Sequence, residues 1–115
     1  ALMPNFKLSR KAKADLRSIA LYTERRWGRE QRNHYILQFD QCFHLLGENP
    51  NLGQSCEDLS PGYRQYPQAS HHILYRVASD GVVEVIRILH QRMLPEAHLL
   101  YELADQFRIG QHQRQ

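Results

Sequence analysis

The dipeptide Asp80-Gly81 constrains the fold of this chain more than any other short stretch. It joins two segments rich in branched and aromatic residues, SHHILYRVA (70–78) and VVEVIRILH (82–90). Asp-Gly readily adopts the positive φ angles of a tight turn, so the two segments are predicted to form an antiparallel β-hairpin. With this turn at the tip, the predicted cross-strand pairs are Ala78–Val83, Tyr75–Ile86, Ile73–Ile88 and His71–His90.

The predicted hairpin has one apolar face and one mixed face. The apolar face is predicted to carry Ile73, Tyr75, Val77, Ile86 and Ile88. The opposite face is predicted to carry His72, Leu74, Arg76, Val85, Arg87 and Leu89. A shift of one residue would move Arg76 and Arg87 to the core side, so the register is expected to be firmly held.

Two helical patterns joined by a single glycine precede the hairpin. Ser9 is a good N-cap for the first helix, in which apolar residues recur at helical spacing. Gly28 ends this helix, and a second helix is predicted over 29–48. Because one glycine connects them, the two helices are expected to fold back as an antiparallel pair. The stripe predicted to cover the apolar face of the hairpin includes Leu16, Ile19, Phe39 and Leu46.

The remaining segments complete an α+β fold. NFKL (5–8) suits an opening strand, residues 50–62 suit a polar loop, and YRQYP (63–67) suits a strand. The predicted order is an N-terminal strand, an antiparallel helical hairpin and a three-stranded antiparallel β-meander. At 115 residues, the whole chain (1–115) is expected to be one domain with its core over 5–93. Residues 95–115 are expected to add a short C-terminal helix and a polar tail.

Basic residues are concentrated in the first third of the chain. The formal net charge is +3 and the pI is about 9.1, yet only Asp15, Glu24 and Glu30 oppose the cations of this region. Such a surface favours an acidic partner: nucleic acid, a nucleoprotein machine or an acidic protein segment. A lone basic helix is more often a solvated face, so this charge alone assigns no function.

Cysteine, histidine and hydropathy patterns narrow the class of protein. Cys42 is predicted to be a small buried hydrophobe, and with Cys56 it forms no disulfide framework, so two free thiols in a reducing cytoplasm are expected. No apolar run reaches the length of a membrane helix and no export signal is visible. The histidines show no HxxxH or HExxH spacing, so no metal site is expected, and no cofactor is expected either.

With these elements in place, the sequence resembles the ParE toxins of the RelE/ParE superfamily. The resemblance rests on LSRKAKADLRSIALYTERRWG (8–28), on GYRQYP and SHHILYRV within 62–77, and on VIRILHQRM (85–93). It covers nearly all of residues 5–93 and leaves the last twenty residues outside. It implies the toxin of a type II toxin–antitoxin pair, which inhibits DNA gyrase by protein binding and is neutralised by a cognate ParD-like antitoxin.

The same resemblance leaves two alternatives open. One is a ribosome-dependent mRNA endoribonuclease of the RelE type, which needs a general acid and base beside arginines on one sheet face. The predicted register sends Arg87 and His90 to opposite faces, which favours binding over bond-breaking chemistry, and no catalytic residue is assigned. The other is an inactive, antitoxin-binding corepressor. A basic domain that binds nucleic acid directly is a further, weaker alternative, because no helix-turn-helix, ribonucleoprotein or glycine-clamp signature is present, and sequence-specific binding is not expected.

The residues predicted to contact gyrase or the antitoxin are mostly cations of the first helix and the sheet. They are Arg64, Arg76, Arg87, His90, Arg92, Met93, Arg10, Lys13 and Arg17. Arg92 and Met93 follow the last strand, where a cation beside a flexible apolar side chain suits a protein contact. His90 is also predicted to pair with His71 across the hairpin and close the end of the core. Tyr22 and Trp27 are interpreted as core residues of the first helix.

Overall fold

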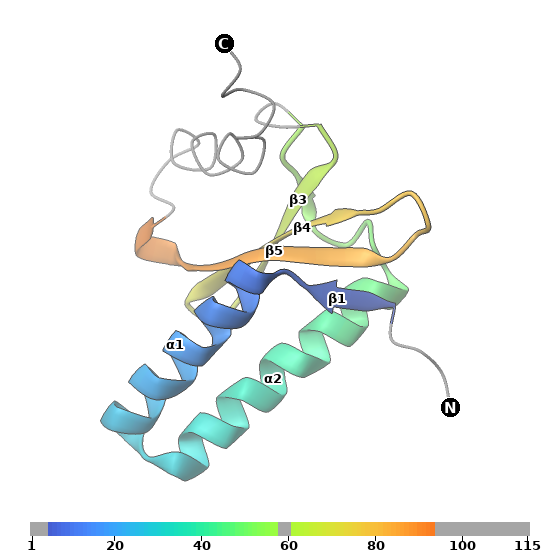
Figure 1. Cartoon of the computed structure of the whole chain (residues 1–115). Helices are drawn as coiled ribbons and strands as arrows, with labels where there is room; N and C mark the ends of the chain where they lie inside the picture. Colours follow the sequence, from blue (N-terminus) through green and yellow to red (C-terminus); the bar gives the residue numbers. More distant parts are fainter. Residues whose placement is uncertain (1–4, 58–60, 94–115) are drawn as a thin grey trace.

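The computed structural model describes residues 5–57 and 61–93 (Figure 1). Its elements are β1 (Phe6–Leu8), α1 (Arg10–Trp27), α2 (Arg29–Glu48), β2 (Gln54–Ser55), β3 (Tyr63–Gln68), β4 (His71–Val77), β5 (Val83–His90) and a 3-10 turn, η1 (Gln91–Met93). The α+β class and the order of strand, helical hairpin and meander are as predicted. The helix and tail predicted over 95–115 lie outside the described residues.

The strands of the described chain form a five-stranded sheet in the order β1-β5-β4-β3-β2. The central part, β3-β4-β5, is the predicted antiparallel meander, and β1 adds to it as a parallel neighbour of β5. β2 pairs antiparallel with β3 within the segment predicted to be a loop, so the prediction of a continuous loop over 50–62 is wrong. A strand of two residues is too short to carry a detectable hydrophobic period, and it forms because the chain runs beside β3.

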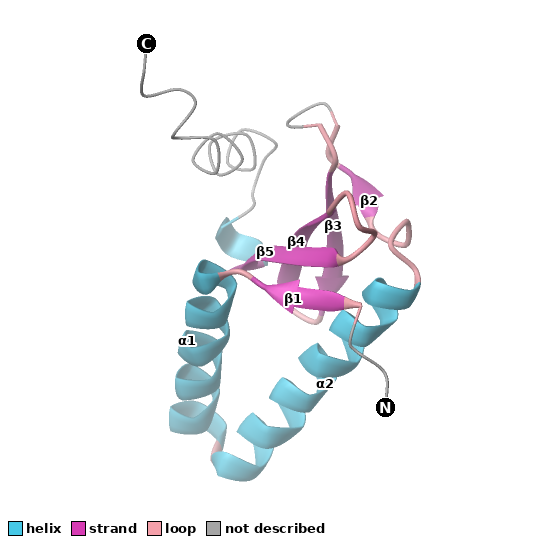
Figure 2. Cartoon of the chain, turned by 45° about the vertical axis from the view of Figure 1, so that its right-hand side comes forward, coloured by secondary structure: helices cyan, strands magenta, loops and turns pink. Residues whose placement is uncertain are grey.

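Local signals at both ends of α1 act as predicted. Ser9 Oγ accepts a hydrogen bond from the Ala12 amide at 3.0 Å, which caps the helix. Gly28 has a φ of 96°, a conformation that glycine adopts without strain, and the chain reverses there into α2. Arg32 Nη1 lies 2.7 Å from Glu24 Oε1 and links the two helices beyond the turn. Both helices lie on the same side of the sheet (Figures 1 and 2).

The β4–β5 register is as predicted at one end and differs by one residue at the other. His71 pairs with His90 and Ile73 with Ile88, as predicted, but Tyr75 pairs with Val85 and not with Ile86. The predicted pairs Tyr75–Ile86 and Ala78–Val83 are therefore wrong. The loop contains three residues, since the Ala78 amide donates to Val82 O at 2.9 Å. A β-bulge between Leu74 and Tyr75 in the pairing absorbs the extra residue of β5.

The bulge changes which side chains of β5 face the helices. Val85 is buried in the helix-facing core, whereas Ile86 joins a second buried cluster with Cys56, Tyr63 and Leu74. Sequence alternation had predicted the reverse for Val85 and Ile86. Val77, predicted on the apolar face, is 39% exposed because it lies next to the hairpin turn. The Arg76 side chain stays on the exposed side, as predicted.

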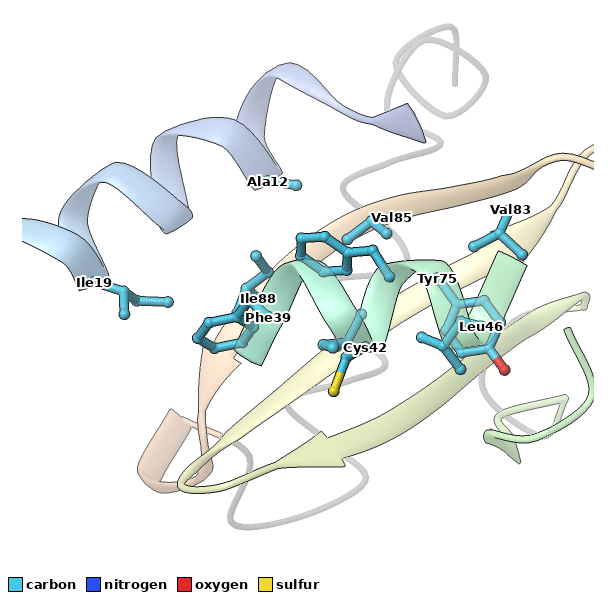
Figure 3. Close-up of a cluster of buried hydrophobic side chains, with 11 residues drawn as sticks. Ala12, Ile19, Phe39, Cys42, Leu46, Tyr75, Val83, Val85 and Ile88 are labelled. Atoms are coloured by element: carbon cyan, nitrogen blue, oxygen red, sulfur yellow. The ribbon is translucent and has the colours of Figure 1, made fainter. Parts of the chain in front are cut away.

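The main core lies between the helical hairpin and the sheet (Figure 3). Ile19, Phe39 and Leu46 are buried and Leu16 packs against them, so the predicted covering stripe is confirmed. Cys42 is buried in this core as predicted, and both cysteines are free and buried. Fully burying a side chain such as Phe39 stabilises the fold by about 1.5–3 kcal/mol. The core thus packs both helices against the sheet. The buried side chains of this cluster are Ala12, Ile19, Phe39, Cys42, Phe43, Leu46, Ile73, Tyr75, Val83, Val85 and Ile88.

Tyr75 anchors the loop that follows α2. Its hydroxyl donates to Pro50 O at 2.6 Å and accepts from the Gly53 amide at 2.9 Å. A Cβ atom on Gly53 would lie 2.5 Å from the same hydroxyl oxygen and 2.7 Å from Gln65 O. This loop therefore requires glycine for a close approach to the sheet.

Candidate partner-binding surface

A groove of about 950 Å³ opens between the helical hairpin and the end of the sheet. The end of the hairpin, where α1 passes into α2, extends away from the sheet in both views (Figures 1 and 2). The groove has residues of α1 and α2 on one side and of the β3–β4 turn and η1 on the other. Its lining includes Tyr22, Trp27, Gln31, Tyr35, His71, His90 and Arg92.

Two exposed aromatic side chains form the helical wall of this groove. Tyr22 is 62% exposed and Trp27 is 65% exposed, so their interpretation as core residues is wrong. The last turn of α1 belongs to the end of the hairpin that extends away from the sheet (Figures 1 and 2). The Arg26 guanidinium lies 5.9 Å from the Tyr22 ring centroid and 5.8 Å from that of Trp27. The wall thus combines aromatic surface with a cation at the open end of the hairpin.

The floor of the groove is a histidine pair held by aromatic residues. The His71 and His90 rings meet edge to face across β4 and β5 with centroids 5.2 Å apart, so the predicted cross-strand pair is confirmed. Tyr35 of α2 and His71 Nδ1 share a hydrogen bond of 2.8 Å, and Phe39 packs against the same imidazole. Burial, with the neighbouring His90 and His72, lowers the pKa of His71 to about 4. His71 is therefore neutral at physiological pH.

Arg92 lies at the rim where β5 ends. It is exposed, lines the groove, and its backbone amide donates to His90 Nδ1 at 3.0 Å. The backbone of Met93 belongs to the same 3-10 turn. Among the predicted binding residues whose side chains the structure describes, His90 and Arg92 line the groove.

Arg87 does not contribute a free cation to either sheet face. Its Nε and Nη2 atoms donate to the Asp15 carboxylate at 2.7 and 3.0 Å, and the Ile88 amide donates to the same carboxylate at 2.9 Å. Both charged side chains are only 16% exposed. Arg87 and Asp15 thus fasten α1 to the part of β5 that β1 does not pair with.

Arg64 and Arg76 are also held by other groups. Arg64 Nε donates to Gly53 O at 2.9 Å and its Nη2 donates to Asn51 O at 3.1 Å. Arg76 Nε lies 2.8 Å from Glu84, and this hydrogen bond lowers the pKa of the Glu84 carboxyl. The three sheet arginines therefore have structural partners and do not meet in one site.

Arg10, Lys13 and Arg17 are exposed on α1, apart from the groove lining. No ion pair joins any of them to another residue in 5–57 or 61–93. Eight of the nine predicted residues thus divide into two groove residues, three structurally paired sheet arginines and three α1 cations without an ion pair, while the side chain of Met93 lies outside the described part of the structure.

Two further properties concern metals and membranes. Within the described ranges, no group of three or more His, Cys, Asp or Glu side chains is arranged to hold a metal ion. No described helix is long and apolar enough to cross a membrane.

Sequence reasoning missed Tyr22, Trp27 and Tyr35 as groove residues. Trp27 directly precedes Gly28, and this position at the end of a helical hairpin is the signal that could have shown its exposure. The groove itself depends on the angle between the hairpin and the sheet, which periodicity does not encode.

Comparison with known proteins assigns the family. Toxin ParE1 of Caulobacter vibrioides is 46% identical over 98 residues, which are 84% of this chain and 99% of that protein. Toxin ParE1 of Mycobacterium tuberculosis is 38% identical over 88 residues, covering 76% and 90% of the two chains. Toxin ParE of Escherichia coli is 32% identical over 107 residues, covering 92% and 99%.

The fold is also found in a solved structure described as a chromosomal ParDE TA system from P. aeruginosa. The TM-score is 0.64 with 23% identity, and the match covers 74% of this chain and 92% of that one. The family model for the ParE toxin of the type II toxin–antitoxin system parDE matches residues 6–95. The chain therefore belongs to the ParE toxin family of type II toxin–antitoxin systems.

Proposed function

We propose that this toxin inhibits DNA gyrase by binding it, and that a cognate ParD-like antitoxin neutralises the toxin by covering the groove. The observation that carries this proposal is the pair of exposed aromatic side chains, Tyr22 and Trp27, on one wall of a groove of about 950 Å³. Aromatic residues of this kind are enriched at the energetic centres of protein interfaces.

The groove suits a peptide segment that carries apolar anchors and a carboxylate. Tyr22 and Trp27 offer apolar area, with the Arg26 guanidinium against both rings, and Arg92 lines the groove where it can pair with an acid. The neutral His71 on the floor does not oppose an apolar anchor with a buried charge. A disordered acidic segment would gain apolar burial and charge pairing together as it orders.

The sheet arginines already have partners within the fold, which favours inhibition by binding over mRNA cleavage. A nuclease must bring cations to the phosphate that reacts and place a general acid and base beside it. Arg64, Arg76 and Arg87 are instead bound to backbone carbonyls or carboxylates within the fold. Recruiting them to a phosphate would break contacts that hold β2, β5 and α1.

Competition at the rim explains how neutralisation would work. Arg92 is exposed at the end of β5, beside the groove that the antitoxin is proposed to fill. If gyrase contacts Arg92, the toxin cannot hold both partners there at once. Arg92→Ala should then weaken gyrase inhibition while the domain stays folded, because the Arg92 side chain is exposed.

The test uses purified toxin, gyrase, antitoxin and ribosomes. Supercoiling should stop when the toxin is added and recover when antitoxin is added with it, while mRNA on ribosomes stays intact. Trp27→Ala should weaken antitoxin binding, and Leu37→Ala, which removes a 54%-exposed apolar side chain outside the groove lining, should not. Ribosome-dependent mRNA cutting without gyrase inhibition would replace the proposal with the nuclease. Antitoxin binding with neither activity would replace it with the corepressor.

A further inference from the structure

Helix α1 carries a row of cations on its solvent side. Arg10, Lys13 and Arg17 are spaced at i, i+3 and i+7, which places them on one face of a helix. All three side chains are exposed, and none of them lines the groove. These three residues are called the α1 basic face below.

The acids of α1 do not neutralise this face. Asp15 is bound bidentately to Arg87 of β5, and Glu24 is paired with Arg32 of α2. In the described chain, Arg10, Lys13 and Arg17 form no ion pair. The α1 basic face therefore presents its charge to solvent.

Fold stability does not account for these cations. The first turn of α1 contains no acidic residue, and Arg10 and Lys13 lie at the positive end of the helix dipole. Cations there are unfavourable for the helix, whereas acids would be favourable. The positions of Arg10 and Lys13 thus favour a role in binding an anion over a role in helix stability.

The chemistry of the face selects the kind of anionic partner. A disordered acidic protein segment needs apolar surface to offset the entropy lost on ordering. Helix α1 exposes no large apolar side chain between Arg10 and Arg17, and the first one, Leu21, lies one turn beyond Arg17. A phosphodiester backbone needs no apolar surface, and arginine pairs bidentately with phosphate. The exposed aromatics that could stack single-stranded bases, Tyr22 and Trp27, line the groove instead.

We propose that the α1 basic face binds the phosphate backbone of duplex DNA without sequence preference. With a rise of 1.5 Å per residue, Arg10 and Lys13 are separated along the helix by about 4.5 Å, and Arg10 and Arg17 by about 10 Å. Phosphates recur about every 3.4 Å of axis along one strand, so each cation can reach a different phosphate. The proposal goes beyond gyrase inhibition, since it concerns DNA alone, and it would keep the toxin on the DNA that gyrase occupies.

The number of phosphate contacts sets how strongly DNA affinity depends on salt concentration. Three phosphate contacts predict a slope of about −2.7 for the logarithm of the association constant against the logarithm of salt concentration. Affinity should then fall by about 40-fold between 50 and 200 mM salt.

The test measures fluorescence anisotropy of a short labelled duplex of arbitrary sequence, titrated with the full chain at several salt concentrations. The variant R10Q/K13Q/R17Q should lose at least tenfold in affinity at 50 mM salt and most of the salt slope. Lys13→Glu should weaken DNA binding and also raise Tm, because it places an acid near the helix N-terminus and four residues before Arg17. Loss of binding with a raised Tm cannot be explained by unfolding.

Arg29→Glu is the matched control, since it makes the same charge change in the first turn of α2, at the far end of α1. It should leave duplex affinity within about threefold of the original chain. Equal losses in Lys13→Glu and Arg29→Glu would overturn the proposal in favour of a net-charge effect. Tighter binding to single-stranded RNA, or to a polyglutamate peptide, than to the duplex would overturn it in favour of that partner. Trp27→Ala should leave duplex binding unchanged. A failed proposal for DNA binding by the α1 basic face can therefore be distinguished from a failed proposal for antitoxin binding in the groove.

Discussion

Asp15→Ala should destabilise the fold strongly, because one carboxylate holds α1 on the sheet through three hydrogen bonds. Two come from Arg87 at 2.7 and 3.0 Å and one from the Ile88 amide at 2.9 Å. Removing one partner of a buried ion pair costs about 3–5 kcal/mol, and a hydrogen bond to a charged group contributes about 1.5–3 kcal/mol. Because the pair is 16% exposed, water can partly solvate Arg87, so we expect a loss of about 2–4 kcal/mol.

Urea denaturation followed by circular dichroism measures this loss directly. With an unfolding entropy of about 0.2 kcal/mol/K for a domain of this size, the Tm should fall by about 10–20 °C. Asp15→Asn keeps the shape and one acceptor oxygen, so its loss should be smaller. The double variant D15A/R87M should be less destabilised than the sum of its single variants, by about 1.5 kcal/mol or more. A loss below about 1 kcal/mol for Asp15→Ala, or additive single variants, would refute this function of the pair.

Three further outcomes follow from single residues. Trp27→Ala should change the free energy of unfolding by no more than about 0.5 kcal/mol. It should lower antitoxin affinity in calorimetry by about 30-fold, the effect of a hot spot of about 2 kcal/mol. A large stability loss would mean that Trp27 belongs to the core. The pKa of His71 falls from 6.5 to about 4 on folding, so the unfolded state binds the proton more tightly than the folded state. The urea midpoint of unfolding should therefore decrease as the pH falls from about 6.5 to about 4. His71→Asn should reduce that decrease. Urea midpoints that stay unchanged between pH 7 and pH 5 would contradict the lowered pKa of His71. Gly53→Ala should cost about 1–3 kcal/mol in the same assay, because its Cβ would meet the Tyr75 hydroxyl, and a neutral effect would show that the loop can move away.

Features set by near neighbours in the chain were predictable from the sequence. Ser9 and Gly28 mark the ends of α1 because capping and positive φ depend on a few adjacent residues. The buried stripe of the two helices follows from a period of 3.6 residues, and Phe39 and Leu46 are in the core as predicted. The histidine pair was predicted because it lies on the side of the bulge where the register is undisturbed.

Features set by three-dimensional arrangement were not predictable in the same way. Asp-Gly is compatible with loops of two or three residues, and the longer loop exchanged Val85 for Ile86 in the core. The partner of Arg87 is Asp15, 72 residues earlier, so no local pattern shows that this arginine is already paired. Trp27 is a large apolar residue of the type that usually packs in a core. It is exposed because the end of the helical hairpin extends away from the sheet.

The most direct measurement titrates a fixed concentration of gyrase with this toxin and follows supercoiling. A toxin that acts by binding should inhibit in proportion to the ratio of toxin to gyrase, with complete inhibition only near saturation of the enzyme. Equimolar antitoxin, added together with the toxin, should restore supercoiling, and Arg92→Ala should require a higher ratio. Complete loss of supercoiling at a small fraction of the gyrase concentration would contradict inhibition by binding, because it would require the toxin to turn over.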